Sequence, residues 1–294
     1  MLERKLVESQ VPLHVKSLQK TYSNGVNAVR GVDLQLEEQQ VHALLGPNGA
    51  GKTTTIKSVL GFIRYEGDVK VFGQNIDRVR DRIAFVPEEK QFYDFLTPRK
   101  ALKWCQKLNP HFDPSRGMEF FAHFSLPLDK KIKSFSHGMK TSLYLSLTFA
   151  QQADLYIFDE PTWGLDPIKR DDVLQMVRDR VIDGKTVLYT SHIIPEVQQI
   201  ADKVSIMANG KILFTGFLDE IKERFRIVIV SPEARLDLQQ YPVMAVARSR
   251  DQVSLLTDTD ESFEHFNRIS ISEPLVPGLE EFFQVLIRGD RHVL

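Results

Sequence analysis

One stretch of nine residues constrains the fold of this chain more than any other. Residues Gly46–Thr54 read "GPNGAGKTT" and fit the pattern G-x-x-x-x-G-K-[ST]. An apolar run, "VHALL", precedes the stretch, and a run typical of a helix, "TTIKSVLGF", follows it. A glycine-rich turn that opens a helix directs successive backbone N–H groups at one point, where they bind phosphate oxygens. The stretch therefore predicts a phosphate-binding loop in an α/β fold rather than a plain glycine-rich turn.

The loop and the start of the following helix supply the residues expected to contact a nucleotide. They are Gly46, Pro47, Asn48, Gly49, Ala50, Gly51, Lys52, Thr53 and Thr54. The Lys52 ammonium is expected to reach the β- and γ-phosphates of ATP, and the Thr53 hydroxyl is expected to ligate Mg²⁺. The motif therefore predicts ATP and Mg²⁺ as the cofactors.

A second apolar run, Leu155–Pro161 ("LYIFDEP"), ends in two acids. Such a run predicts a buried parallel strand that presents carboxylates at the edge of the sheet where α/β folds bind ligands. Alone, two acids at a strand end indicate a solvated turn more often than a site, but here they accompany a phosphate-binding loop. We therefore expect Asp159 to hold the Mg²⁺ shell and Glu160 to polarise the attacking water.

The first three quarters of the chain alternate strand-like and helix-like runs. Helical character dominates from about residue 95 to residue 150, opened by a Thr97-Pro98 pair that suits a helix N-terminus. The run "VSIMANGKILFTG" predicts a hairpin, because Asn209-Gly210 suits a tight turn with positive φ. The expected fold is an α/β core with a mixed sheet over residues 1–224, interrupted by a helical insertion subdomain at about 95–150.

The composition changes after Lys222, beyond which no lysine occurs. The pattern becomes short strand-like runs ("RIVIVS", "VMAVARS", "QVSLLTD", "RISISE"), with helices expected near Glu261–Asn267 and Gly278–Ile287. We therefore expect residues 225–294 to form a small, separate α+β domain.

Charge and cysteine content exclude several classes of protein. The 38 lysine and arginine residues against 39 acids leave a formal net charge of −1, so no nucleic acid partner is expected. The single cysteine, Cys105, excludes an internal disulfide and suits a reducing cytosol. No apolar run approaches the roughly 18 residues of a membrane span, and the N-terminus lacks a signal peptide's apolar core. The expected location is cytoplasmic, and any membrane part must come from another chain.

With these motifs, the chain resembles the ATP-binding subunits of ABC transporters over about residues 12–222. Tyr22 is similar to the aromatic residue that stacks on adenine in that family. Gly164–Asp166 ("GLD") is similar to the loop that contacts the second subunit, and His192, which ends "VLYTSH", to the switch histidine that contacts the γ-phosphate. All the motifs come in the family's order, which makes coincidence negligible.

The resemblance implies a P-loop ATPase in which Glu160 and His192 act in catalysis and Tyr22 and Asp166 contact the nucleotide. It also implies a head-to-tail pair of ATP-binding subunits, either a homodimer or a heterodimer with another such subunit. A separate transmembrane permease is the expected partner, and it would hold this chain at the inner face of the cell membrane. The ending "EPLVPGLEEFFQVLIRG" resembles the tail of bacterial exporter ATPases, which favours export over import.

One departure from the family lies in "FVPEEKQFYDF". The family's glutamine, which contacts Mg²⁺ and the attacking water, is Glu88 here. A glutamate keeps the ligating oxygen but adds negative charge, so it either strengthens Mg²⁺ binding or opposes closure around ATP. Glu89 and Gln91 leave this alignment open by about a residue.

An aromatic cluster follows that departure: Phe92, Tyr93 and Phe95. The resemblance places it where the family's membrane partner docks. Packing of the helical subdomain is the alternative, because exposed aromatic residues mark interfaces but buried ones form cores.

The other departure is "FSHGM", where the family usually has Leu-Ser-Gly-Gly. His137 replaces the first glycine, while Ser136 and Gly138 remain. A hydroxyl and an unhindered N–H at a helix N-terminus can both donate to the γ-phosphate of ATP held by another subunit. A plain serine N-cap is the alternative, but the position shortly before Leu155–Glu160 favours a signature motif. Trp163 stands where the family has a small residue, and either packing or a functional role fits it.

Three functions remain to be compared. The first is a transport ATPase that couples ATP-driven dimerisation to export. The second is a soluble relative in DNA repair or on the ribosome, but the chain has neither a long heptad run nor a second cassette. The third is a nucleotide-gated regulatory module, which retention of Glu160 and His192 opposes. We therefore predict the transport ATPase.

Overall fold

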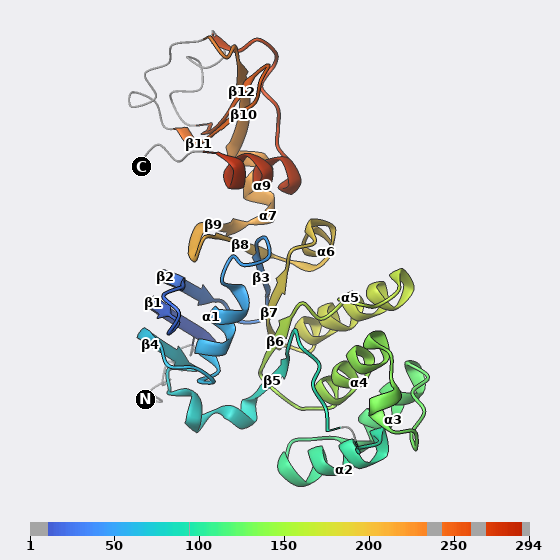
Figure 1. Cartoon of the computed structure of the whole chain (residues 1–294). Coiled ribbons are helices and arrows are strands. Elements are labelled where there is room, and N and C mark those ends of the chain that lie inside the picture. The colour runs from blue at the N-terminus through green and yellow to red at the C-terminus, as the bar shows by residue number, and fades with distance from the viewer. Residues whose placement is uncertain (1–10, 94, 234–242, 260–268, 290–294) are drawn as a thin grey trace, which may run out of the picture.

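A six-stranded mixed sheet carries the phosphate-binding loop at its centre (Figure 1). The computed structural model describes residues 11–93, 95–233, 243–259 and 269–289. In the order β5-β6-β7-β3-β8-β9, the strands are Ile83–Val86, Leu155–Asp159, Thr186–Ser191, Val41–Leu45, Lys203–Ala208 and Lys211–Phe217. All neighbours pair in parallel except β8 and β9, which form the predicted antiparallel hairpin. Asn209 and Gly210 have φ values of 49° and 77° at its turn, as expected.

The central strands are buried on both faces, which explains why they read as continuous apolar runs. Along β6, Leu155 and Ile157 face helix α1 (Lys52–Val59). Tyr156 and Phe158 face the opposite way, into the core beneath helices α4 (His137–Phe149) and α5 (Pro167–Ile182). Figure 1 shows α1 on one side of the sheet and α4 and α5 on the other.

A second, antiparallel sheet covers helix α1 on the side away from the central sheet. Its order is β2-β1-β4, with strands Asn27–Leu36, Leu13–Thr21 and Glu66–Val71. Alternate residues of β1 and β2 are buried, which matches a sheet with one face packed and one in water. Two short 3₁₀ turns, Ile76–Arg78 and Arg80–Arg82, then lead to β5.

The insertion predicted at about 95–150 is helical. It contains α2 (Pro98–Leu108), α3 (Pro114–His123), the 3₁₀ turn Ile132–Ser134 and α4. Side-chain caps start each α-helix: Thr97, Asp113 and Ser136 accept hydrogen bonds from N–H groups of the first turn. The predicted start of α2 at Thr97-Pro98 is therefore confirmed. The insertion forms the end of the molecule opposite the C-terminal strands (Figure 1).

Beyond β7, helix α6 (Ile194–Ile200) and helix α7 (Leu218–Arg224) lead to a third sheet. This sheet is antiparallel, in the order β10-β12-β11, with strands Phe225–Val230, Val253–Asp258 and Val243–Arg248. The amphipathic helix α9 (Leu279–Arg288) packs against it. The prediction of a strand at "RISISE" (268–273) is wrong: among its described residues, the Ile271 N–H donates to the Ile229 carbonyl oxygen, but the isolated bridge to Ile227 is made by Leu275, beyond the segment. The helix expected at 261–267 lies outside the described residues.

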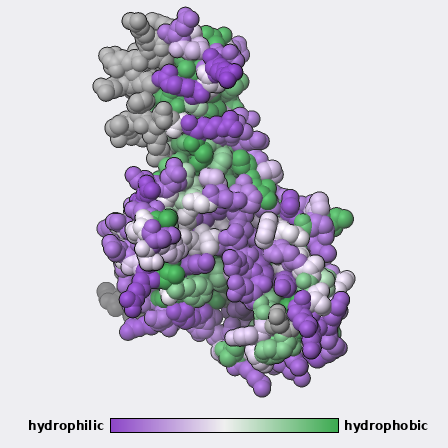
Figure 2. Space-filling view, in the orientation of Figure 1, coloured by the Kyte–Doolittle hydropathy of each residue, from purple (hydrophilic) through white to green (hydrophobic). Residues whose placement is uncertain are grey.

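The C-terminal unit shares an apolar cluster with the central sheet. Leu45 of β3 and Val197 of α6 belong to the same cluster as Phe225 of β10 and Phe282 of α9. Figure 2 shows hydrophobic residues gathered where the two parts join, and again over the helical subdomain. A domain boundary near residue 224 stays a prediction, because the two parts are packed together there. Within the described ranges, no helix has the length and hydropathy to cross a membrane.

Candidate functional site

The phosphate-binding loop joins the end of β3 to the N-terminus of α1, as its sequence predicts. Gly49 and Gly51 have φ values of 79° and 109°, which only glycine adopts at low cost. A Cβ at Gly46 would lie 2.2 Å from the carbonyl oxygen of Met207, so the loop also needs glycine for close packing. The loop and α1 line a hollow of ≈ 340 Å³ with backbone N–H groups at a helix N-terminus.

Lys52 points back over the loop. Its Nζ donates to the carbonyl oxygen of Gly46 at 2.7 Å and lies 3.2 Å from Glu160 Oε1, as an ion pair. Lys52 and Glu160 are in contact as charges only, because Glu160 Oε1 makes no hydrogen bond. Both side chains are almost fully buried. Lys52 therefore has an anionic partner at the centre of the hollow, where a phosphate is expected.

Asp159 and Glu160 end strand β6 at the edge of the hollow. Asp159 accepts a hydrogen bond from Thr190 Oγ1 at 2.6 Å. Burial raises the pKa of Asp159, and hydrogen bonds from Thr190 and Thr53 oppose that rise. Glu160 has a φ of 46°, a left-handed conformation that costs about 1–3 kcal/mol in a residue other than glycine. Its Oε2 lies 2.9 Å from His192 Nδ1, so the structure brings the two predicted catalytic residues together.

Of the two neighbouring acids, Glu88 is the one that bonds the start of α1. Thr53 Oγ1 donates to Glu88 Oε2 at 3.0 Å, while Glu89 accepts from Gln91 Nε2 at 3.0 Å. The two acids thus have different hydrogen-bond partners, whereas the sequence left open which of them matches the family's glutamine. Both acids, with Thr53 and Asp159, line a common hollow on the outer side of the loop.

Tyr22 and Thr54 close another side of the site. The Tyr22 hydroxyl and Thr54 Oγ1 lie 3.3 Å apart, and the tyrosine ring is partly exposed beside the loop. Val26 and Ala28 also line the hollow. Sequence reasoning missed both, because neither carries a polar group, and only their place after Tyr22 indicates them.

Lys90 is a second residue that sequence reasoning missed. Its side chain is 6% exposed, and its Nζ donates to the carbonyl oxygens of Glu88 at 3.0 Å and Glu160 at 3.2 Å. Burial lowers the pKa of Lys90 to about 8, and the negative charges of Asp159, Glu88 and Glu160 oppose that change. Nothing in "PEEKQF" distinguishes this lysine from a surface lysine.

The signature segment lies outside the hollow that the loop lines. Ser136 Oγ accepts from the N–H of Met139 at 3.2 Å, so the serine is an N-cap, and its hydroxyl proton remains able to donate to another group. A Cβ at Gly138 would lie 2.7 Å from the carbonyl oxygen of Gly164. Glycine at 138 is therefore required by packing within this chain. Any contact of Ser136 or Gly138 with a nucleotide requires another copy or another subunit.

His137 turns toward Trp163 of its own chain. The two rings lie 4.4 Å apart between centroids at an angle of 72°. A Cβ at Gly164 would lie 2.3 Å from His137 Cδ2, and Thr141 Oγ1 donates to the Trp163 carbonyl oxygen at 3.3 Å. Burial, followed by the positive charges of Lys90 and Lys140, lowers the pKa of His137. The two unusual residues therefore pack against each other.

Asp166 is the N-cap of α5. Its Oδ1 accepts from the N–H of Lys169 at 3.0 Å, and its Oδ2 lies 3.3 Å from Lys169 Nζ. These contacts, with the charge of Lys169, lower the pKa of Asp166, and the backbone hydrogen bond has the largest effect. The structure does not bring Asp166 to the phosphate loop of the same chain, so its contact with a nucleotide stays a prediction.

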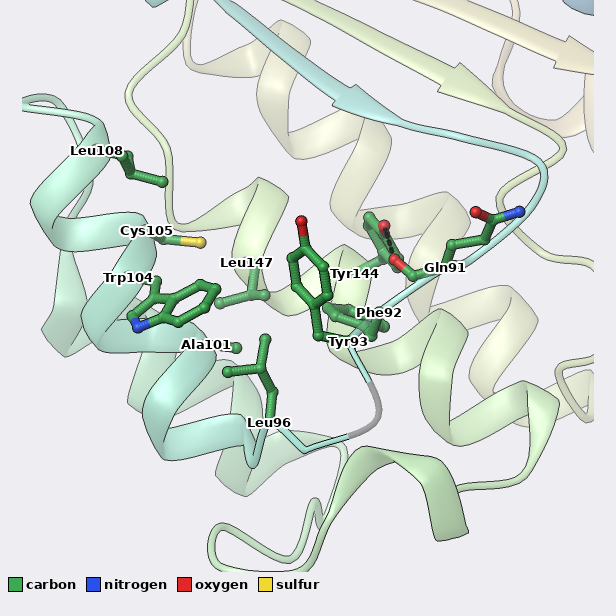
Figure 3. Close-up of a pocket in the computed structure, with 10 residues that line it drawn as sticks. All are labelled: Gln91, Phe92, Tyr93, Leu96, Ala101, Trp104, Cys105, Leu108, Tyr144 and Leu147. Carbon is green, nitrogen blue, oxygen red and sulfur yellow. Dashed lines mark hydrogen bonds between the residues drawn. The ribbon is translucent and has the colours of Figure 1, made fainter.

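A second hollow of ≈ 640 Å³ lies between α2, α4 and the segment after β5 (Figure 3). Phe92 packs on Tyr144, whose hydroxyl donates to the Gln91 carbonyl oxygen. Tyr93 is exposed, and its ring faces Trp104 across the hollow, while Phe95 stacks on Tyr93. Phe92 thus packs the subdomain, whereas Tyr93 and Phe95 lie at the surface.

Comparison with known proteins agrees with this geometry. The family model described as "ABC transporter" matches residues 29–163. The "ABC transporter ATP-binding protein YtrB" of Bacillus subtilis (strain 168) is 29% identical over 280 residues, which cover 91% of this chain and 96% of that protein. The "Linearmycin resistance ATP-binding protein LnrL" of the same organism is 31% identical and is matched over 72% of this chain and 71% of its own length.

A solved structure described as "Structure of ATP binding subunit of ABC transporter" superposes with a TM-score of 0.66 at 28% identity. The match covers 72% of this chain and 92% of the solved one. The predicted fold class and family are both confirmed. This chain belongs to the ATP-binding subunits of ABC transporters, a family of ATPases.

Proposed function

We propose that this chain hydrolyses Mg-ATP to drive export through a separate transmembrane permease, with a second ATP-binding subunit completing each site. The observation that carries the proposal is the meeting of five side chains at one sheet edge. They come from the phosphate loop, the end of β6 and the end of β7: Lys52, Thr53, Asp159, Glu160 and His192. A glycine-rich turn without chemistry has no need of buried charges there.

The loop and Lys52 bind the phosphates. Residues 48–54 line the hollow at the N-terminus of α1, and Lys52 Nζ is held beside them by the Gly46 carbonyl oxygen. A phosphate that enters competes with Glu160 for the Lys52 ammonium. Nucleotide binding thereby releases the Glu160 carboxylate for its own role. The exposed Tyr22 ring stacks on the adenine.

The residues present fit Mg²⁺. The Thr53 hydroxyl and the Asp159 and Glu88 carboxylates form an all-oxygen donor set beside the loop. Mg²⁺ in nucleotide sites takes one or two carboxylates and completes its shell with phosphates and water. When bound, the ion neutralises charge that develops on the transferred phosphoryl group. Thr53, Asp159 and Glu88 would hold it.

Glu160 acts as the residue that orients and polarises the attacking water. Its carboxylate is held on two sides, by Lys52 at Oε1 and by His192 Nδ1 at Oε2. The His192 ring, which is about one-third exposed, keeps Nε2 for the γ-phosphate. The left-handed backbone conformation of Glu160 sets the direction in which its side chain leaves the main chain.

Ser136 and Gly138 act on the nucleotide of another subunit, since they lie apart from the hollow of their own chain. One chain carries both halves of a site, so two copies suffice to complete two sites. A heterodimer with a different ATP-binding subunit is the alternative arrangement.

The permease docks in the hollow drawn in Figure 3, which is lined by apolar and aromatic side chains and open to solvent. Exposed Tyr93 and Phe95 offer the rigid aromatic contacts that interfaces favour. Contact with the permease places this chain at the inner face of the cell membrane. Export is favoured because the similar protein LnrL is described as a resistance protein.

The test uses Glu160→Gln in the full chain. Oligomeric state is measured by light scattering with and without saturating Mg-ATP, and phosphate release is measured in the wild type and in the variant. We expect the variant to bind ATP, to lose turnover and to form a stable dimer. Glu89→Gln is the matched control, because it removes the same charge from a side chain that bonds Gln91 and neither Lys52 nor His192. A Glu160→Gln chain that binds ATP yet stays monomeric contradicts the two-copy mechanism.

A further inference from the structure

Lys90 joins two segments of the ATP site that are far apart in the sequence. It follows β5 in the loop that carries Glu88, and it reaches the turn after β6 that carries Glu160. Its Nζ donates to the carbonyl oxygens of both residues, at 3.0 Å and 3.2 Å. A single ammonium therefore fixes the spacing between the Glu88 loop and the Glu160 turn.

The same ammonium lies among three carboxylates. The negative charges of Glu88 and Glu160 each disfavour the charged form of Asp159. All three acids, in turn, stabilise the charge of Lys90. Lys52 faces only Glu160 in an ion pair. Lys90 differs from Lys52 in that it bonds the main chain of two of these acids, Glu88 included.

Burying the ammonium of Lys90 costs free energy. Removing an ammonium from water carries a large penalty unless charges and hydrogen bonds compensate for it. Exposed lysines elsewhere in the chain, such as Lys100, avoid that cost. Lys90 is 6% exposed, and its ammonium donates hydrogen bonds to two main-chain carbonyl oxygens of the site. The compensation it receives comes from the acids of the site itself.

We propose that Lys90 is a positioning residue of the ATP site, which holds the Glu88 loop against the Glu160 turn and offsets the negative charge of Glu88. This inference rests on the proposed function, because it takes the hollow beside the loop to be the site of Mg-ATP. It also decides between the two effects that the sequence left open for Glu88. With Lys90 beside it, the extra carboxylate does not repel the incoming nucleotide.

The test is a double-mutant cycle over wild type, Glu88→Gln, Lys90→Met and the double variant, with the Kd for Mg-ATP measured by calorimetry. Methionine keeps most of the buried volume and removes the charge. We expect Lys90→Met to raise the Kd about tenfold, because one positive charge beside the three carboxylates is then lost. Adding Glu88→Gln should return the Kd to within about threefold of the wild type.

A matched second-site control separates charge at the site from net charge. Glu89→Gln in the Lys90→Met background removes the same charge from the rim of the same hollow, but Glu89 bonds Gln91 and not Thr53. We expect no restoration there. Equal restoration by both second substitutions, or restoration by neither, overturns the proposal. If Lys90→Met yields unfolded protein, recovery of folded protein by Glu88→Gln alone supports the proposal, and failure to recover it counts against it.

Turnover is measured on the same four chains. A positioning role predicts that Lys90→Met lowers kcat as well as raising KM, and that Glu88→Gln restores KM more than kcat, because the link between the two segments is still lost. A wild-type chain that binds but never hydrolyses ATP would overturn the proposed function. The Kd cycle would still decide the role of Lys90.

Discussion

Replacing Glu160 by glutamine is expected to tighten the binding of ADP. Lys52 Nζ lies 3.2 Å from Glu160 Oε1, and the two side chains are 6% and 7% exposed. A nucleotide phosphate must therefore take Lys52 from an existing buried partner. Glutamine leaves only a dipole in place of the carboxylate, so the Lys52 ammonium becomes available at lower cost.

The size of the effect follows from that distance. Two unit charges 3.2 Å apart attract by about 5 kcal/mol at an effective dielectric constant near 20. Desolvation of both groups offsets most of this, which leaves a value at the lower end of the roughly 1.5–7 kcal/mol found for close charge pairs. Since glutamine retains part of the contact, we expect about 1.4 kcal/mol, which is about a tenfold lower Kd.

Isothermal titration with Mg-ADP measures this effect. ADP lacks the γ-phosphate expected to bridge to a second subunit, so dimerisation does not contribute. Glu89→Gln serves as the control for net charge, and its Kd should match the wild type. The ratio of the two Kd values should persist at high salt, because buried pairs are weakly screened. An unchanged or higher Kd for Glu160→Gln refutes the view that this ion pair competes with phosphate.

Three further predictions concern single residues. Burial lowers the pKa of His42 to about 4, so the unfolded chain gains a proton near pH 6.5 before the folded chain does. The stability from neutral His42 is complete above that pH and is lost as pH falls toward 4; urea unfolding should show about 2 kcal/mol lost between pH 7 and pH 5 that His42→Gln does not show. Gly164→Ala should lower the midpoint of thermal unfolding, because residue 164 has a φ of 81° and the new Cβ would clash with the His137 ring. His137→Gly in that background should restore part of the loss. Burial raises the pKa of Cys105 to about 11, so iodoacetamide at pH 8 should label it about a hundredfold more slowly in the folded chain than in urea, by mass spectrometry.

The phosphate loop and the acidic strand end were predictable because their chemistry dictates their residues. A loop that surrounds phosphate with N–H groups needs glycines at positive φ, and Gly49 and Gly51 have them. A strand buried on both faces must be apolar, so two acids at the end of "LYIF" indicate the sheet edge. Local rules also predicted the Thr97 cap and the Asn209-Gly210 turn.

Contacts between distant segments could not be predicted in this way. The packing of His137 on Trp163 joins residues 26 positions apart (163 − 137), and each looks like an isolated anomaly in sequence. Burial of Lys90 depends on where the Glu160 turn lies in space. The segment "RISISE" alternates as a strand does, but a strand also needs a continuous ladder of backbone hydrogen bonds to a partner. Here the Ile271 N–H bonds the Ile229 carbonyl oxygen, and the bridge to Ile227 comes only at Leu275, beyond the segment.

The apolar cluster that joins the two parts of the chain has a consequence for how this protein can be cut. Leu45 immediately precedes the phosphate loop, and it belongs to the cluster that Phe282 and Leu286 of α9 complete. A chain truncated at residue 224 would expose this side of β3 and β8 to water. Such a fragment should aggregate, and shortening the tail would weaken the strand from which the nucleotide site begins. The C-terminal part therefore helps to stabilise the strand that leads into the nucleotide site.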